Sequence, residues 1–240
     1  MNLHPALDGI DLVVFDKDGT LISFSAMWGG WARELGSRLE IATRRPVAGD
    51  VFATIGYDPT TDRVLPGGPL AASTMAAIEE LVAAVLRRWC PSAPAARRIL
   101  AEAWYEPDPV AAAVPLADLP ALFGALRASG RQIAVATTDD RRPTEATLAG
   151  LGLSGMVAAI ACGDDDGPTK PDPRTVLSLA AEVGVPIDRV ALVSDTVADL
   201  DMARAAGVGL VIGVGSGITD DEELAPHADV LLSTVGDLIG

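Results

Sequence analysis

The sequence has little of what several classes of protein require. Only two of its 240 residues are cysteines and only two are histidines. We therefore expect no disulfide framework and no His/Cys metal cluster, and a reducing compartment fits. Acidic residues outnumber basic ones by 33 to 18, which gives a formal net charge of -15. Because nucleic acids and anionic membranes bind basic patches, we expect neither as a partner.

Long apolar runs are also absent. Ala205–Val214 is too short to cross a bilayer, and Leu70–Leu86 is interrupted by Glu79 and Glu80. Residues 1–11 lack the basic and apolar regions of a signal peptide. Hydrophobic residues make up 49% of the chain, enough for one large domain or a core with a smaller appendage. We expect a soluble cytoplasmic protein, either a monomer or a homodimer.

Short apolar runs recur along the chain without clear alternation, which is typical of strands buried on both faces of a parallel sheet. They are Leu12–Phe15, Ile133–Ala136, Val157–Ala161, Val190–Val193 and Leu210–Val214. Helical patterns lie between them and stop at glycines. These are Leu116–Ser129, Thr144–Ala149, Arg174–Val183 and Val197–Ala206. Repeated strand–helix units predict an α/β fold with a doubly wound parallel sheet.

The connection between Thr20 and Thr137 is much longer than a single crossover needs. Helical spacing recurs inside it, over Trp28–Ile41, Thr74–Trp89 and Ala95–Tyr105. We predict an α-helical cap inserted after the first strand, at residues 22–112, over the C-terminal edge of the sheet. Residues 1–21 and 113–240 would then form the catalytic core.

The first expected strand ends in the segment Asp16-Lys17-Asp18-Gly19-Thr20. In open α/β sheets, ligands bind beyond the carboxyl ends of the strands, where both acids fall. Two carboxylates at one mouth can hold a hard cation between them. One of them can also attack an electrophile while the other handles the proton. A simpler interpretation is a turn with two solvated acids.

Three further segments carry polar groups that a phosphoryl-transfer site needs. Thr137 and Thr138 end one expected strand, Lys170 precedes a helix, and Asp195 ends another strand with Asp199 four residues later. Each has an ordinary explanation when taken alone: a strand-ending threonine, a surface lysine, or an acid complementing a helix dipole. Taken together and in this order, they predict one site at one edge of the sheet.

In these four segments the chain resembles the haloacid dehalogenase-like phosphatases across nearly its whole length. The position of the expected cap resembles the phosphoglycolate phosphatase-like branch. The resemblance implies that Asp16 is the nucleophile, forming an aspartyl-phosphate, and that Asp18 is the general acid/base. It also implies phosphoryl-oxygen binding by Thr137, Thr138 and Lys170. Mg²⁺ would be held by the Asp16 and Asp195 carboxylates and by the backbone carbonyl of Asp18. Asp199 would contact these groups rather than the ion itself.

The resemblance implies Mg²⁺-dependent hydrolysis of a small organic phosphomonoester, and 2-phosphoglycolate is the best single choice. A sugar-phosphate phosphomutase carries the same acids and stays open as an alternative. A haloacid dehalogenase is a less favoured alternative, because it does not need Asp18. A non-enzymatic binding module is the least favoured, because it would require a broken site. Ser194 departs from the usual glycine of the family, Thr138 from the common asparagine or small polar residue, and Ser23 from a position that is often acidic. Asp164-Asp165-Asp166 is expected to be a solvated turn.

Overall fold

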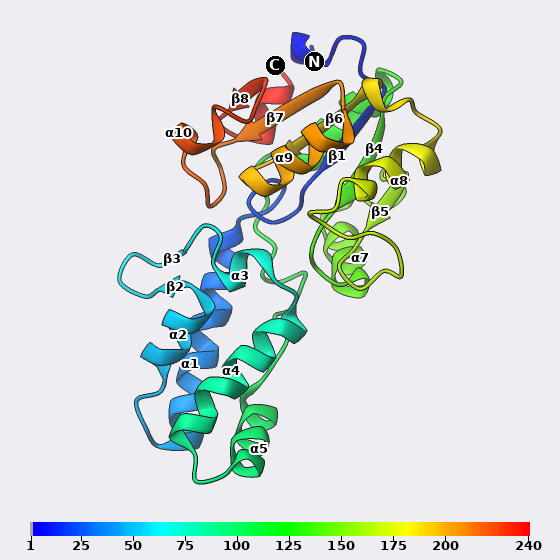
Figure 1. Ribbon diagram of the computed structural model, residues 1–240. Coiled ribbons are helices and arrows are strands. Elements are labelled where there is room, and N and C mark those ends of the chain that lie inside the picture. The colour runs from blue at the N-terminus through cyan, green and yellow to red at the C-terminus, as the bar shows by residue number, and fades with distance from the viewer. Residues whose placement is uncertain (1) are drawn as a thin grey trace. The chain divides into compact units, whose positions relative to one another are not determined.

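The computed structural model describes residues 2–240, which divide into two compact units (Figure 1). One unit contains the chain up to Phe24 and from Pro109 to Gly240, and the other runs from Ser25 to Asp108. The inserted unit is slightly shorter than the expected range of 22–112. The flanking residues pair with the first unit instead, because Ile22 bridges both Asp18 and Pro115.

The first unit is built on a six-stranded sheet with the order β5-β4-β1-β6-β7-β8, in which every pairing is parallel. This arrangement confirms the predicted doubly wound α/β fold. The edge strand β8 was not predicted, because three half-buried residues give too short an apolar run. The strands are β1 (Leu12–Phe15), β4 (Gln132–Ala136), β5 (Ala159–Ala161), β6 (Val190–Ser194), β7 (Leu210–Val214) and β8 (Val230–Leu232).

Helices cover both faces of this sheet. Leu12 and Val14 of β1 belong to one core with residues of α8 and α9, whereas Phe15 stacks on Phe123 of α6 with ring centroids 5.3 Å apart. Two covered faces explain why the strands read as continuous apolar runs. The helices are α6 (Leu119–Ala128), α7 (Arg141–Gly150), α8 (Arg174–Val183), α9 (Val197–Ala206) and α10 (Asp221–Leu224), with 3-10 turns at Pro5–Leu7, Ile187–Arg189 and Val235–Leu238.

The inserted unit is mainly helical. Its core includes Trp31, whose ring contacts those of Trp28, Trp104 and Tyr105 and whose Nε1 donates to the Tyr105 carbonyl at 2.9 Å. The elements are a π-helix (Ser25–Gly29), α1 (Gly30–Thr43), α2 (Ala48–Ile55), β2 (Tyr57–Asp58), β3 (Arg63–Val64), α3 (Pro69–Ala72), α4 (Met75–Trp89) and α5 (Ala93–Ala103). Within residues 2–240, no helix is both long enough and apolar enough to cross a membrane.

The register of the central strands positions the predicted site. Phe15 is level with Val135 of β4 and with Val193 of β6, and the Asp16 backbone N–H donates to the Val193 carbonyl at 2.9 Å. The residues that follow β1, β4 and β6 therefore leave the sheet at the same height. β1 lies between β4 and β6, and the strand order runs outward in opposite directions on its two sides. The carboxyl end of β1 is therefore a topological switch point, where ligands bind in such sheets.

Candidate active site

The Lys170 side chain lies between two of the predicted carboxylates. Its Nζ is 2.5 Å from Asp16 Oδ1 and 2.6 Å from Asp199 Oδ2, and it also donates to the Ala136 carbonyl at 3.4 Å. The Lys170 side chain is only 7% exposed. A buried ammonium group is stable only when it is paired and hydrogen-bonded, so the two acids and the carbonyl explain how it is accommodated. We call Lys170, Asp16 and Asp199 the Lys170 triad.

Ser194 helps to orient the Lys170 triad. Its hydroxyl donates to Asp199 Oδ2 at 2.7 Å and accepts from the Thr196 backbone N–H at 3.2 Å. Thr196 is in turn the N-cap of α9, where its side chain accepts from the Asp199 N–H at 3.4 Å. The hydroxyl at a position where a glycine was expected therefore has a definite partner in the site.

Asp195 is fully buried, and its carboxylate is held from two sides. Oδ1 accepts from Thr20 Oγ1 at 3.1 Å, and Oδ2 accepts from the Ile218 N–H at 3.0 Å. A Cβ at Gly19 would lie 2.4 Å from Asp195 Oδ2, and one at Gly217 would lie 1.8 Å from it. Both positions therefore require glycine so that the backbone can approach the carboxylate.

The Lys17 side chain also lies between two carboxylates. Its Nζ is 2.7 Å from Asp18 Oδ2 and 2.8 Å from Asp139 Oδ2, and the side chain is 1% exposed. We call these three residues the Lys17 triad. Lys17 and Lys170 are the only lysines in the sequence, and every other basic side chain, histidine aside, is an arginine. Both lysines thus lie at the sheet edge that carries the predicted acids.

The two predicted threonines occupy the loop after β4. Thr137 is buried, its N–H donates to the Ala161 carbonyl at 2.9 Å, and its Oγ1 accepts from the Asp139 N–H at 3.1 Å. Thr138 is half-buried. Among residues 2–240, no hydrogen bond joins the Thr138 side chain to the predicted acids or to Lys170. Its association with the site therefore follows only from its position in the loop after β4.

The site carries more negative than positive charge. Burial raises the pKa of Asp16 well above its usual value, and Asp199 and Asp195 raise it further, although Lys170 opposes this. Burial likewise raises the pKa of Asp195 to about 6, against the Ile218 N–H bond. Only two ammonium groups face five carboxylates, those of Asp16, Asp18, Asp139, Asp195 and Asp199.

This charge balance fits a divalent cation. The predicted ligands, the Asp16 and Asp195 carboxylates and the Asp18 backbone carbonyl, offer only oxygen atoms, and these would suit a hard ion such as Mg²⁺. Burial by itself would lower the pKa of Lys170, but Asp16 and Asp199 hold it above its usual value. Lys170 therefore stays charged, and the remaining excess of negative charge is available to an added cation.

Asp164 and Asp166 lie in an exposed turn, as expected, but Asp165 is half-buried, and both Asp164 and Asp165 bind Arg141. Asp165 accepts from Arg141 Nε and Nη2, both at 2.8 Å, and Asp164 Oδ1 accepts from the Arg141 backbone N–H at 2.8 Å. These acids fix the beginning of α7. Their oxygens and the Cys162 sulfur are close enough to form a metal site. However, because both carboxylates already bind Arg141, we do not assign a metal there.

Several site residues were missed by sequence reasoning. They are Lys17, Thr20, Asp139, Ser216, Gly217 and Ile218. Ser216 Oγ donates to the Gly19 carbonyl at 2.8 Å, so the loop after β7 closes on the loop after β1. A usable signal existed, because β7 is parallel to β6 and its carboxyl end must reach the same edge.

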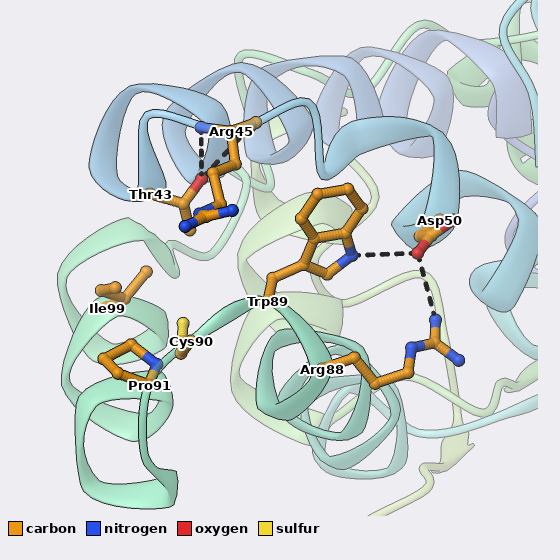
Figure 2. A pocket seen from close by; sticks show the side chains of 8 residues that line it. All are labelled: Thr43, Arg45, Asp50, Arg88, Trp89, Cys90, Pro91 and Ile99. Atoms are coloured by element: carbon orange, nitrogen blue, oxygen red, sulfur yellow. Dashed lines mark hydrogen bonds and ion pairs between the residues drawn. The ribbon is translucent and has the colours of Figure 1, made fainter.

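A separate cavity of about 830 Å³ lies in the inserted unit (Figure 2). Its single carboxylate, Asp50, already accepts from Trp89 Nε1 at 2.9 Å and lies 3.4 Å from Arg88 Nη2. The cavity therefore has no paired acids for phosphoryl transfer, and the sheet edge is the stronger candidate. The lining residues are Thr43, Arg45, Asp50, Arg88, Trp89, Cys90, Pro91 and Ile99.

Comparison with solved structures supports the fold assignment. A predicted phosphoglycolate phosphatase from Haemophilus somnus aligns with a TM-score of 0.67 at 18% identity, covering 96% of both chains. A putative beta-phosphoglucomutase from Thermotoga maritima aligns with a TM-score of 0.65, also at 18% identity, covering 96% of this chain and 97% of that one. At these identities, the likeness establishes the fold alone.

Two of the sequence relatives are named phosphoglycolate phosphatase. A phosphoglycolate phosphatase of Agrobacterium fabrum is 29% identical over 92% of this chain and 87% of its own length. Another, from Rhodospirillum rubrum, is 38% identical, but the match spans only 46% of each chain. The family model described as haloacid dehalogenase-like hydrolase matches residues 10–207. Family and relatives together support an enzyme that hydrolyses phosphoric monoesters. The chain belongs to the haloacid dehalogenase-like hydrolase family.

Proposed function

We propose that this protein is a Mg²⁺-dependent phosphatase that hydrolyses a small organic phosphomonoester through an aspartyl-phosphate on Asp16. The observation that carries the proposal is the Lys170 triad beside the buried Asp195. The Asp16 carboxylate, the Lys170 ammonium group and the Asp195 carboxylate all lie at the switch point of the sheet, which supports their proposed roles as nucleophile, fixed positive charge and cation ligand. Phosphoryl transfer depends on this kind of positioning and charge neutralisation.

In the first step, an Asp16 oxygen attacks phosphorus and the bond to the ester oxygen breaks. Oδ1 is bound to Lys170, while Oδ2 makes no hydrogen bond within residues 2–240, so Oδ2 is the attacking atom in this proposal. Asp18, in its protonated form, gives its proton to the departing ester oxygen. Lys170 and Thr137 bind the non-bridging phosphoryl oxygens, with the Thr138 backbone assisting.

In the second step, the Asp18 carboxylate takes a proton from a water molecule whose oxygen attacks phosphorus. The bond between phosphorus and Asp16 breaks, which releases inorganic phosphate and restores the Asp16 carboxylate. Mg²⁺, held by Asp16, Asp195 and the Asp18 carbonyl, would supply charge neutralisation to the phosphoryl oxygens. Asp199 keeps Lys170 in place through both steps.

The proposed substrate is 2-phosphoglycolate, with support from the names of the relatives in Agrobacterium fabrum and Rhodospirillum rubrum. The inserted unit, residues 25–108, is proposed to act as a cap that selects the substrate. Its covalent connections support this role, because the chain leaves the core shortly after β1, the strand that carries Asp16 and Asp18.

A screen of phosphomonoesters tests the proposal. We expect hydrolysis with Mg²⁺, its loss in excess chelator, and no hydrolysis by Asp16→Asn under either condition. Undiminished activity in chelator would contradict the metal assignment. A requirement for a sugar bisphosphate, with isomerised sugar phosphate as product, would identify a phosphomutase instead. Hydrolysis of other esters with 2-phosphoglycolate untouched would overturn only the substrate.

A further inference from the structure

We propose that Lys17 is a positioning residue, anchored by Asp139, that fixes the Asp18 carboxylate for proton transfer to the leaving group. The inference deepens the proposed function and rests on it, because it requires Asp18 to act as the general acid. It assigns a role to Lys17 and Asp139, which belong neither to the proposed phosphoryl-binding groups nor to the carboxylates proposed to bind the cation.

The first argument is the burial of Lys17. Its ammonium group lies 2.7 Å from Asp18 and 2.8 Å from Asp139, with only 1% of the side chain exposed. Burying an ammonium is costly, and well-packed apolar residues in place of a buried ion pair are often neutral or stabilising. Stability alone therefore gives little reason for a lysine here. A defined orientation of the partner carboxylate gives a better one.

The second argument is that the Lys17 backbone is fixed. Its carbonyl accepts from the Leu21 N–H at 2.8 Å and from the Ile22 N–H at 3.1 Å. The Gly19 N–H donates back to the Ile22 carbonyl at 2.7 Å. The loop that carries Asp18 is thus closed by backbone hydrogen bonds. The Lys17 side chain therefore extends from a fixed backbone position toward Asp18.

The third argument is that Asp139 is an anchored partner. Its N–H donates to Thr137 Oγ1 at 3.1 Å, and its carbonyl accepts from the Gly163 N–H at 2.8 Å. Asp139 is therefore held between the loop after β4 and the loop after β5. Because the same Lys17 ammonium group binds both carboxylates, the anchored Asp139 also restricts the position of the Asp18 carboxylate.

A positioning role predicts a dependence on the leaving group. An alkoxide leaving group needs a proton as the ester bond breaks, whereas p-nitrophenolate leaves readily without one. Displacement of Asp18 should therefore impair alkyl esters far more than p-nitrophenyl phosphate. The informative quantity is kcat/KM, because it reports steps up to the departure of the leaving group and excludes the later attack by water.

The experiment compares wild type, Lys17→Met and Asp139→Asn on p-nitrophenyl phosphate and on the alkyl monoester that the wild type hydrolyses best. For Lys17→Met we expect kcat/KM to fall roughly 10–100-fold for the alkyl ester and less than about 3-fold for p-nitrophenyl phosphate, a part of the effect of a complete general acid. Asp139→Asn should show the same pattern with a smaller loss. Arg189→Met, which breaks an ion pair with Asp11 at the other end of β1, is the control and should change neither value.

Equal losses for both esters, or no loss for either, would overturn the proposal. If Lys17→Met does not fold, Asp139→Asn decides the question by the same ratio. Failure of the proposed function would look different, because the wild type itself would then hydrolyse no monoester. A second readout uses the scarcity of lysine: selective ¹⁵N labelling should give two side-chain ammonium signals. Asp139→Asn should shift the Lys17 signal and leave the Lys170 signal in place, and movement of Lys170 alone would contradict the contact.

Discussion

The Lys170 and Lys17 triads have the same composition, one ammonium between two carboxylates, yet they differ in what surrounds them. In the Lys170 triad, Asp199 is only 4% exposed and is further bound by Ser194, while Asp16 is 10% exposed. In the Lys17 triad, Asp18 and Asp139 are somewhat more open, at 12% and 15%. The triad whose second acid, Asp199, is held by Ser194 contains the proposed nucleophile, and the triad with the more buried lysine contains the group proposed to exchange protons with ester and water.

The largest expected effect comes from Asp16→Asn in the Lys170 triad. Turnover should fall about 10⁴-fold or more, the scale of an essential nucleophile. The fold should persist, because the amide is nearly isosteric and Lys170 keeps Asp199. Steady-state kinetics and metal-free thermal unfolding check this together. Near-normal turnover by the folded variant would exclude a covalent role for Asp16.

Lys170→Met should be the next most damaging substitution and should separate the two triads most clearly. It removes the charge that binds phosphoryl oxygens, so kcat/KM should fall about 10²- to 10³-fold, as when a preorganised donor is lost. The loss should be the same for alkyl and p-nitrophenyl esters. A strong dependence on the leaving group would show that the roles of the two lysines had been assigned the wrong way round.

Asp18→Asn tests the proton-transfer side of the comparison. We expect alkyl-ester turnover to fall about 10²- to 10⁴-fold, the usual contribution of general acid–base catalysis. Steady-state hydrolysis of p-nitrophenyl phosphate should also slow, because water attack on the aspartyl-phosphate still needs a base. Wild-type steady-state rates on p-nitrophenyl phosphate would contradict the assignment of Asp18.

Ser194→Ala sharpens the comparison within the Lys170 triad, because it removes only the hydroxyl that binds Asp199. The substitution removes the hydrogen bond to Asp199 and the one from the Thr196 N–H, which should cost about 1–2 kcal/mol of unfolding free energy, with a loss of kcat of several-fold. Ser194→Gly installs the residue expected for the family and is the matched variant. If both variants were as active and stable as wild type, the hydroxyl would have no role in holding Asp199.

The last prediction concerns the stability of the metal-free protein rather than its activity. Burial raises the pKa of Asp195 to about 6, and burial together with Asp18 raises that of Asp139 to about 6 against Lys17. Between the ordinary value of 3.8 and about 6, the native state therefore binds more protons than the unfolded state. Its stability should decline as pH rises through this window.

Thermal unfolding in chelator between about pH 4 and 7 measures this decline. Mg²⁺ should restore stability most at the upper end of the range, because it binds the ionised carboxylates. A metal-free melting temperature that rose steadily across the window would contradict the sign of the effect.

The sequence predicted five of the six strands and named the three residues of the Lys170 triad, because strand ends can be read from apolar runs. Asp16, Asp195 and Asp199 follow strands whose parallel order places them at one edge, and Lys170 lies in the loop that returns to it. The Lys17 triad could not be read in this way. Contact between the adjacent side chains of Lys17 and Asp18 depends on the closed turn after β1, which periodicity does not describe.

The β2–β3 hairpin and the helix α2 were missed for a related reason. A two-residue strand such as Tyr57–Asp58 has no apolar pattern, and α2 spans only eight residues. The cradle around Asp195 depends on how closely Gly217 approaches it, a distance that arises only when the loops after β1 and β7 meet. Such tertiary contacts lie beyond local sequence patterns.

The central claim is that the phosphoryl group passes through an enzyme carboxylate, and the stereochemistry at phosphorus tests it most directly. The wild-type protein would hydrolyse a phosphorothioate monoester whose phosphorus is made chiral by the sulfur and two oxygen isotopes, in water carrying the third isotope. Two in-line displacements, first by Asp16 and then by water, predict net retention of configuration in the inorganic thiophosphate. Net inversion would mean a single direct attack by water and would contradict the aspartyl-phosphate mechanism.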